Sequence, residues 1–364
     1  LVSLGGLVAL NVMVDSKSFD FPSLSLAISE MGMGESTQFK IFGMLLFGFG
    51  ILVALFPFHT WAARGYEAAP NSVSMLHAGV LKKFGLYGLI QIAAPLLPEG
   101  ALSWSPYLLW LALGNVLFVG FITIAQTNLK SMIGNGSVMH MGYCFLGVAV
   151  CSSLGAGSAV MLMAAHGLSV SLMFLVAQYV YRRSGTFEMN EIGGLASHAP
   201  LLACFFIAGS LATIGLPGFG NFWGEFGVFL SLGENKEHKL FLVLSALGII
   251  ISAIFGLRAV AKVFYGKHSD ELSDYVKSSP IYDLSVSEMI PAGFLVAALL
   301  FLGLWPRGIS DRVNREVLLR YESLNHLSEP GSQLAPCCPP QNGEANLQEL
   351  ESSGKKVRPQ PRGL

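Results

Sequence analysis

Long apolar segments fill most of this chain and limit what it can fold into. Nine of them are candidate membrane-crossing helices, and several are followed by short polar turns. A helix needs about 20 apolar residues to cross the hydrocarbon core of a bilayer. The chain is 52% hydrophobic and 12% charged, against about 25% charged in an ordinary soluble domain. The sequence therefore predicts an all-α polytopic membrane protein.

The apolar segments also predict where the helices begin and end. They lie at 1–14, 38–63, 72–97, 105–126, 130–152, 156–182, 199–232, 238–266 and 286–306. The first segment is apolar from its first residue and lacks the charged region and cleavage site of a signal peptide, so we interpret it as part of a helix in an N-terminally truncated chain. Longer polar loops are expected at 15–37 and 267–285, and residues 1–306 are predicted to form one transmembrane domain.

The character of the chain changes after Pro306. Residues 307–327 are predicted to form an amphipathic helix on the membrane surface. One side of it carries five apolar residues, which are Val313, Val317, Leu318, Tyr321 and Leu324. Residues 328–364 are rich in Pro, Gly, Ser, Gln and charge without an apolar period, so disorder is expected there. Cys337 and Cys338 in this tail lie in no lipidation motif.

Two of the predicted helices contain breaks. Pro57 cannot continue the hydrogen-bond ladder of the helix at 38–63. The helix at 199–232 carries a cluster of breakers within ten residues of Glu225, which are Gly215, Pro217, Gly218 and Gly220. Broken helices in transporters place the ends of half-helices beside ions. Glu225 is thus expected in the first turns of a second half-helix, where the helix dipole favours a negative charge.

Positive residues predict the orientation of the helices. Eight Lys and Arg residues follow the even-numbered predicted helices, which are Arg64, Lys130, Arg182, Arg183, Arg258, Lys262, Lys267 and Lys277. Four follow the odd-numbered ones, which are Lys17, Lys40, Lys236 and Lys239. Because positive residues are enriched on the cytoplasmic side, the first set is expected to face the cytoplasm or the mitochondrial matrix.

Four ionisable side chains lie inside four different apolar segments: Lys83, His140, His166 and Glu225. Ionisable groups at membrane depth are costly and usually mark an ion path. A regular helix puts Gly79 on the same face as Lys83, which predicts room for water beside the amine. Burial favours a neutral amine and imidazole is half-protonated near neutral pH, so both groups can pass protons. Together the four residues predict a proton route.

The same residues also have structural explanations that involve no proton route. Lys83 could extend its amine to the membrane interface. The two histidines could be core residues bonded to nearby hydroxyls, those of Ser137 and Tyr143 for His140 and that of Ser169 for His166. They could also bind haem, although no other feature of the sequence supports it. Secondary candidates for the proton route are Lys82, which points about 100° away from Lys83 around a helix, and His59 and His77.

No motif of a soluble enzyme is present. The sequence has no GxGxxG following a strand, no P-loop, no HExxH and no GxSxG. The five cysteines form no CxxC pair, and no block of Lys or Arg suggests nucleic-acid binding. We therefore expect no catalytic residue, cofactor or metal site in this chain.

Seven stretches, in order along residues 57–226, resemble the antiporter-like membrane subunits of respiratory complex I, in particular the chain M branch (subunit 4 in mitochondria). They are PFHTW (57–61), EAAP (67–70), AGVLKKFGLYG (78–88), QTNLKSMIGNGSVMHMG (126–142), AAHGLS (164–169), GGLA (193–196) and LPGFGNFWGEF (216–226). The resemblance implies a 14-helix fold with two inverted five-helix repeats, each with one broken helix. This chain would hold roughly the last nine helices.

The resemblance also implies roles for particular residues. Lys83 matches the central lysine of the family, Glu225 the glutamate of the second broken helix, and His140 and His166 the linking histidines. Three positions depart from the family pattern, which are Leu52 in place of a lysine, Asn128 in place of an aspartate and Arg182 in place of a glutamate. Leu52 cannot carry a proton, so either the uptake path is rewired or this copy pumps less well.

The implied function is proton translocation coupled to electron transfer from NADH to quinone. NADH, FMN, iron–sulfur clusters and quinone would be bound by other subunits of the parent complex, and none by this chain. The implied partners are neighbouring membrane subunits and lipid, in a bacterial plasma membrane or the mitochondrial inner membrane. Three alternatives share the fold: a subunit of a multi-subunit sodium/proton antiporter, a non-pumping structural module, and a membrane hydrogenase subunit.

Overall fold

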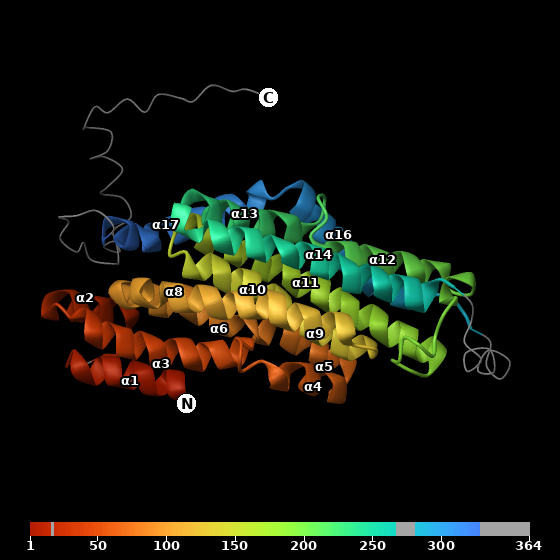
Figure 1. The fold of residues 1–364 in the computed structure, drawn as a ribbon, viewed down its shortest axis with the longest axis horizontal. Helices are drawn as coiled ribbons and strands as arrows, with labels where there is room; N and C mark the ends of the chain where they lie inside the picture. Colours follow the sequence, from red (N-terminus) through yellow and green to blue (C-terminus); the bar gives the residue numbers. More distant parts are fainter. Residues whose placement is uncertain (16–17, 267–280, 328–364) are drawn as a thin grey trace, which may run out of the picture.

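The computed structural model describes residues 1–15, 18–266 and 281–327, which form a bundle of helices that run along one axis (Figure 1). Within these residues the backbone forms no β-strand beyond an isolated bridge between Asn128 and Glu188. The all-α fold class is thus confirmed. The expectations for the tail, including Cys337 and Cys338, lie outside the described residues.

The first part of the bundle is built from helices with several short interruptions. They are α1 (Val2–Met13), α2 (Phe21–Met31), α3 (Glu35–Val53), α4 (Thr60–Ala68), the run α5 (Asn71–Leu76), η1 (His77–Leu81), α6 (Lys83–Gly88), η2 (Leu89–Ala93) and α7 (Ala94–Leu96), and the run α8 (Pro98–Gly114), η3 (Asn115–Val119) and α9 (Gly120–Ala125). In this part η1, η2 and η3 are π-helical turns inside longer helices.

The second part contains the longest helices. They are α10 (Leu129–Ala149), α11 (Ser153–Ser184), the short η4 (Leu195–Ser197), α12 (Pro200–Ile214), α13 (Gly220–Glu234), η5 (Lys236–His238), α14 (Lys239–Phe264), α16 (Val286–Leu304) and α17 (Arg307–Leu327). Every residue of α10 is buried, so this helix lies in the core of the bundle. It packs against α11, α8 and α4.

Five helical stretches in the described residues are long and apolar enough to cross a membrane, which are Glu35–Val53, Pro98–Ala125, Ser153–Ser184, Lys236–Phe264 and Val286–Leu304. The other predicted spans are shorter, more polar or divided. The number of nine spanning helices stays a prediction.

Both predicted helix breaks are present. The first separates α3 from α4, and Ala54 there has a left-handed backbone with φ of 69°. The side chain of Asn115 forms hydrogen bonds with two backbone groups at this break. It donates to the carbonyl of Ala54 at 3.1 Å and accepts from the amide of Phe56 at 2.5 Å. Broken backbone at membrane depth needs such partners because no water satisfies it there.

The second break separates α12 from α13. Gly215 and Gly218 have positive φ angles of 82° and 103°, which glycine adopts without steric cost. The backbone of Gly218 also lies so close to Gly303 of α16 that a side chain at Gly303 would collide with it. Glu225 is the sixth residue of α13, one turn and a half into the second half-helix, as the sequence predicts.

Three local expectations were wrong. The loop expected at 15–37 contains α2, whose buried Leu24 and Ile28 recur at helical spacing although the segment is too short to span a bilayer. The helix expected to start at residue 105 begins at Pro98, because proline suits the first turn of a helix. The helix at 72–97 is regular only in parts, since two π-helical turns interrupt it.

The segment predicted as an amphipathic helix is helix α17. Val317 and Tyr321 are buried, and the helix contacts α11, α7 and α8. Leu318 was placed on the same side but is exposed. The apolar side of α17 therefore covers the bundle itself, and its position on the membrane surface stays a prediction.

An ion pair joins the end of α11 to the start of α16. Arg183 Nη2 lies 2.8 Å from Glu288 Oε2, and the same guanidinium donates to the carbonyls of Tyr282, Asp283 and Tyr179. Arg182 lies 3.3 Å from the other oxygen of Glu288, and its side chain is 59% exposed against 9% for Arg183.

We expect Arg183→Met to destabilise the protein by about 3 kcal/mol, because it leaves a partly buried carboxylate and several carbonyls without their donor. Arg182→Met is the matched control and should cost less than about 1 kcal/mol, since that pair is solvated. Thermal unfolding of the detergent-solubilised protein measures both. Equal losses in the two variants would contradict this account.

Candidate functional site

The four ionisable residues singled out in the sequence form one buried row. Lys83 Nζ lies 3.1 Å from His166 Nδ1. The rings of His166 and His140 follow, with centroids 5.6 Å apart. His140 Nε2 then lies 3.8 Å from Glu225 Oε1. All four side chains are buried, so the fold brings together residues from α6, α11, α10 and α13.

Lys83 is positioned by a π-helical turn and a close helix contact. It is the first residue of α6, directly after η1 and Lys82, and its Nζ also donates to the carbonyl of Ala78. Gly79 and Gly167 face each other between η1 and α11, where either side chain would meet the other's backbone. This close approach brings the amine of Lys83 to the His166 ring.

His140 is oriented by the backbone of its own helix. Its Nδ1 lies 2.7 Å from the carbonyl oxygen of Gly136. Because a carbonyl only accepts, Nδ1 carries the proton in that bond. Nε2 is then the nitrogen that faces Glu225. The 3.8 Å between them is longer than a hydrogen bond, so a proton crosses with a small side-chain movement or through a bridging water.

Glu225 sits beside the break in its helix. Its carboxylate lies against the backbone of Gly215, where a Cβ atom would collide with it. Its Oε1 makes no hydrogen bond to any described residue. One turn earlier, Asn221 donates to Ser169 Oγ at 3.1 Å, and Ser169 donates to the carbonyl of His166. These bonds tie α13 to α11 near the row.

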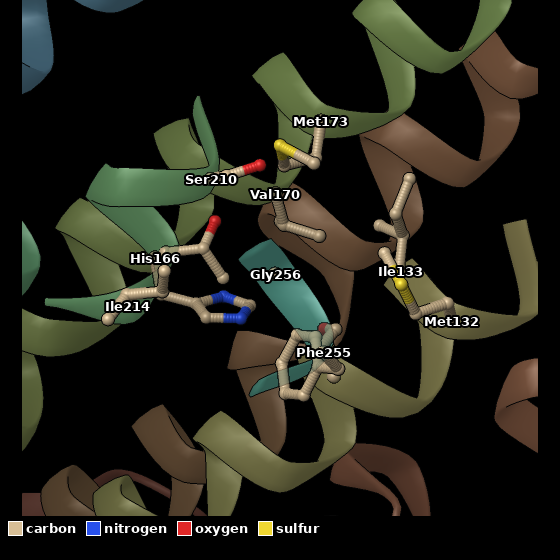
Figure 2. Close-up of a pocket in the computed structure, with 12 residues that line it drawn as sticks. Met132, Ile133, His166, Val170, Met173, Ser210, Ile214, Phe255 and Gly256 are labelled. Atoms are coloured by element: carbon tan, nitrogen blue, oxygen red, sulfur yellow. The ribbon is translucent and has the colours of Figure 1, made fainter. Parts of the chain in front are cut away.

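A small cavity of about 20 Å³ opens beside the His166 ring (Figure 2). Its polar lining includes His166, Ser137, Ser210 and Thr213. The hydroxyls of Ser137 and Ser210 have no hydrogen-bond partner among the described residues. The volume suffices for about one water molecule, which needs roughly 10–15 Å³ and two or more polar partners. The row therefore has a small, mostly apolar cavity at His166 that is bordered by two hydroxyls without a hydrogen-bond partner among the described residues.

Among the described residues, no hydrogen bond joins the side chains of the secondary candidates to the row. His59 is buried between the rings of Phe56 and Phe118. His77 pairs its Nδ1 with the hydroxyl of Tyr66 at 3.2 Å. Lys82 is buried near that same tyrosine.

Leu52, where the resemblance implies a lysine, is 38% exposed near the end of α3, so it points out of the described bundle. The other two departures have clear structural roles. The Asn128 side chain caps α10 by accepting from the amides of Lys130 and Ser131. Arg182 pairs with Glu288.

Several expected local contacts were wrong. Tyr143 donates to the carbonyl of Ser245, and Ser137 makes no bond to a described residue, so neither hydroxyl partners His140. Gly79 makes room for α11 and Ser171 where water was expected. In each case the residue spacing predicts a helical face but not which helix packs against that face.

Other polar residues at the site were missed. Asn221 lies four residues before Glu225, and this i, i+4 spacing on an apolar segment was the available signal. Asn115 carried no signal in the sequence, because its role depends on the distant break at Ala54. Within the described residues, no group of three His, Cys, Asp or Glu side chains could hold a metal ion.

The sequence of this chain is similar to one known protein family and to curated members of it. The family described as "NADH:quinone oxidoreductase/Mrp antiporter, TM" matches residues 2–252. NADH-quinone oxidoreductase subunit M of Rickettsia bellii is 34% identical over 267 residues, which cover 73% of this chain and 52% of the relative. NAD(P)H-quinone oxidoreductase chain 4 3 of Picosynechococcus is 34% identical over 249 residues, covering 67% and 45%. The chain thus spans about half the length of the curated relatives it matches.

Chains in two solved membrane complexes have a similar fold. A chain of respiratory complex I from Thermus thermophilus with bound NADH matches with a TM-score of 0.80 and 28% identity, over 88% of this chain and 66% of that one. A chain of the Mrp complex from Dietzia matches with a TM-score of 0.78 at 17% identity, over 88% and 65%, which shows the shared fold alone. The long apolar helices and these matches together show that this chain is an integral membrane protein.

Proposed function

Since the chain belongs to the NADH:quinone oxidoreductase/Mrp antiporter transmembrane family, we propose that it carries protons across the membrane as part of an NADH–quinone oxidoreductase. The observation that supports this most directly is the buried row of Lys83, His166, His140 and Glu225. A membrane-buried row of ionisable groups costs stability, and a proton path is the usual reason for one.

In the proposed mechanism, Lys83 receives a proton and passes it to His166 at 3.1 Å. His140 takes it next on Nε2, because its Nδ1–H is bonded to the Gly136 carbonyl, and the same Nε2 then releases it to Glu225. Glu225 then releases it toward the opposite side of the membrane. Each step moves one proton between nitrogen or oxygen atoms, so no other bond changes.

Electrostatics can drive this transfer. Moving one charge against a potential of 100 mV costs about 2.3 kcal/mol. Two charges about 4 Å apart interact with roughly 4 kcal/mol at an effective dielectric constant of about 20. A charge that arrives next to the row is therefore strong enough to push a proton onward. We propose that redox chemistry elsewhere in the complex supplies that charge movement.

The rest of the assembly follows from this proposal. NADH, FMN, iron–sulfur clusters and quinone would be bound by other subunits, and neighbouring antiporter-like subunits would contact this chain within the membrane. The membrane would be the bacterial plasma membrane or the mitochondrial inner membrane. These assignments rest on what the relatives are named.

NADH-driven acidification of native membrane vesicles tests the proposal. We expect vesicles that contain the chain to pump protons on NADH addition, and a deletion strain to lose the share that this chain carries. Equal pumping with and without the chain, in complexes shown to be assembled otherwise, would reject the proposal.

The second candidate is a subunit of a sodium/proton antiporter, favoured by the fold match to the Mrp complex. It predicts a proton flux driven by a sodium gradient without NADH. The third is a structural module, favoured by Leu52 at the family's lysine position. It predicts that neutral variants of the row alter assembly and leave proton flux intact.

A further inference from the structure

Lys82 is a buried ionisable group that the row from Lys83 to Glu225 does not use. Its side chain is 0% exposed, and its Nζ has no hydrogen-bond partner among the described residues. Nζ lies 5.9 Å from the centre of the Tyr66 ring, at the limit of a cation–π contact. A buried amine with so few partners is costly for the fold, which argues for a role beyond packing.

The backbone places the two neighbouring lysines in different surroundings. The amide of Lys82 donates to the carbonyl of His77 at 2.9 Å, which closes the π-helical turn η1. Lys82 is directed to Tyr66 of α4, whereas Lys83 is directed to His166 of α11. Such π-helical turns occur frequently at functional sites. The pair thus connects the row to a second region of the protein.

That second region contains a cavity of about 140 Å³. Its lining includes Tyr66 and His77, whose hydroxyl and Nδ1 are 3.2 Å apart, together with Trp61, Ser74 and Val73. One water molecule needs roughly 10–15 Å³, so several fit. Trp61 and Val73 are exposed, so this cavity lies at the surface of the described chain.

The cavity borders charged groups of the predicted cytoplasmic or matrix side. Lys130 Nζ donates to the carbonyl of Ala69, which lines the cavity, and to the carbonyl of Glu67. The Glu67 carboxylate accepts from Ser131. Figure 1 shows α4 and α5 toward the end of the bundle where α9 ends. The cavity therefore lies beside the polar groups of Lys130, Glu67 and Ser131.

We propose that Lys82 takes up protons from this cavity through Tyr66 and His77 and delivers them to Lys83. The inference rests on the proposed proton-carrying function and adds its uptake site. The neutral amine of Lys82 accepts a proton and becomes an ammonium, and transfer of that proton to Lys83 restores the amine. Two adjacent buried ammonium groups repel each other. A proton on Lys82 therefore favours transfer of the Lys83 proton to His166.

Proton uptake in native membranes, driven by NADH, tests this step in three variants. Lys82→Met should slow uptake roughly 100-fold or more, as expected for loss of a proton-transfer group. Lys83→Met should abolish the uptake that this chain supports, and Lys40→Met, an exposed lysine on α3, should behave as native. Native uptake in Lys82→Met alone would overturn the inference and leave the proposed function standing. Native uptake in all three variants would overturn both.

Conservative variants separate proton transfer from a purely structural charge. Histidine exchanges protons near neutral pH, whereas arginine stays charged. Lys82→His should retain more uptake than Lys82→Arg. If Lys82→Arg works as well as the native protein, the amine only supplies charge against Tyr66 and the inference is wrong.

A variant of the cavity keeps the test valid even where Lys82 variants fail to assemble. Val73→Trp adds bulk at a 52% exposed position that lines the cavity. Val243→Trp is the matched control, at a 63% exposed position on α14 outside the lining. We expect uptake to fall several-fold in the first variant and to stay native in the second. Equal uptake in the two would contradict a path through this cavity.

Discussion

Lys83→Met is expected to abolish the proton pumping proposed for this chain while the complex still assembles. Methionine is flexible and similar in length, so it can occupy the buried site without leaving a large cavity. It cannot bind a proton, and removal of a proton-transfer group typically slows a reaction by roughly 100-fold or more. His166 then loses the amine that lies 3.1 Å from its Nδ1. The measurement is NADH-driven acidification of vesicles, with assembly checked on the same membranes.

Two controls make this result interpretable. Lys40→Met makes the same change at an exposed lysine on α3 and should pump as the native protein does. Phe84→Leu changes the exposed neighbour of Lys83 in α6 and should also pump normally. Intact pumping in Lys83→Met would favour the structural alternative. Loss of assembly in Lys83→Met but in neither control would mean that the amine serves packing.

The sequence predicted the parts of the site that depend on local chemistry. Lys83, His140, His166 and Glu225 were recognisable because each is ionisable inside an apolar segment, and such residues are rare enough to stand out. The break before Glu225 was equally clear, because Gly215 and Pro217 cannot both sit in a regular helix. These are properties of single segments, so they can be read without the fold.

The order of the row could not be predicted in the same way. The contact between Lys83 and His166 depends on the close approach at Gly79 and Gly167, residues that are far apart in the sequence. The π-helical turn before Lys82 depends on packing between helices, and the residues of His77–Leu81 carry no sequence pattern that predicts it. Tyr87 lies one turn after Lys83 in the regular helix α6, yet Tyr87 is exposed whereas Lys83 is buried. Long-range packing decided each of these features.

The same reasoning explains the misplaced helix boundaries. A membrane-spanning helix needs about 20 apolar residues, whereas α2 has only 11 residues, so its segment lacks the pattern of a span. The start of α8 was missed because Pro98 and Glu99 look like loop residues, although both are favourable in a first helical turn. Composition predicts which segments are apolar, whereas capping residues decide where each helix begins.

Glu225→Gln is expected to stop proton release while a single uptake step survives. Glutamine keeps the size of the side chain beside Gly215 but cannot bind a proton at neutral pH. Lys83, His166 and His140 remain intact, so a proton taken up from the opposite side can still reach His140. It then lacks an acceptor at 3.8 Å, and steady pumping should fall roughly 100-fold. Side-resolved pH dyes during one round of NADH oxidation measure uptake and release separately.

Which signal each variant loses, proton uptake or proton release, decides whether protons move along the row from Lys83 to Glu225. Lys83→Met should lose uptake and release together, because it removes the first member of the row. Glu225→Gln should lose release alone, and Glu225→Asp should restore part of it, because a carboxylate is present again at a greater distance. Glu234→Gln, an exposed change on the same helix α13, is the matched control and should leave both signals native. Uptake lost in Glu225→Gln and kept in Lys83→Met would require the opposite direction, with protons received at Glu225 and released through Lys83.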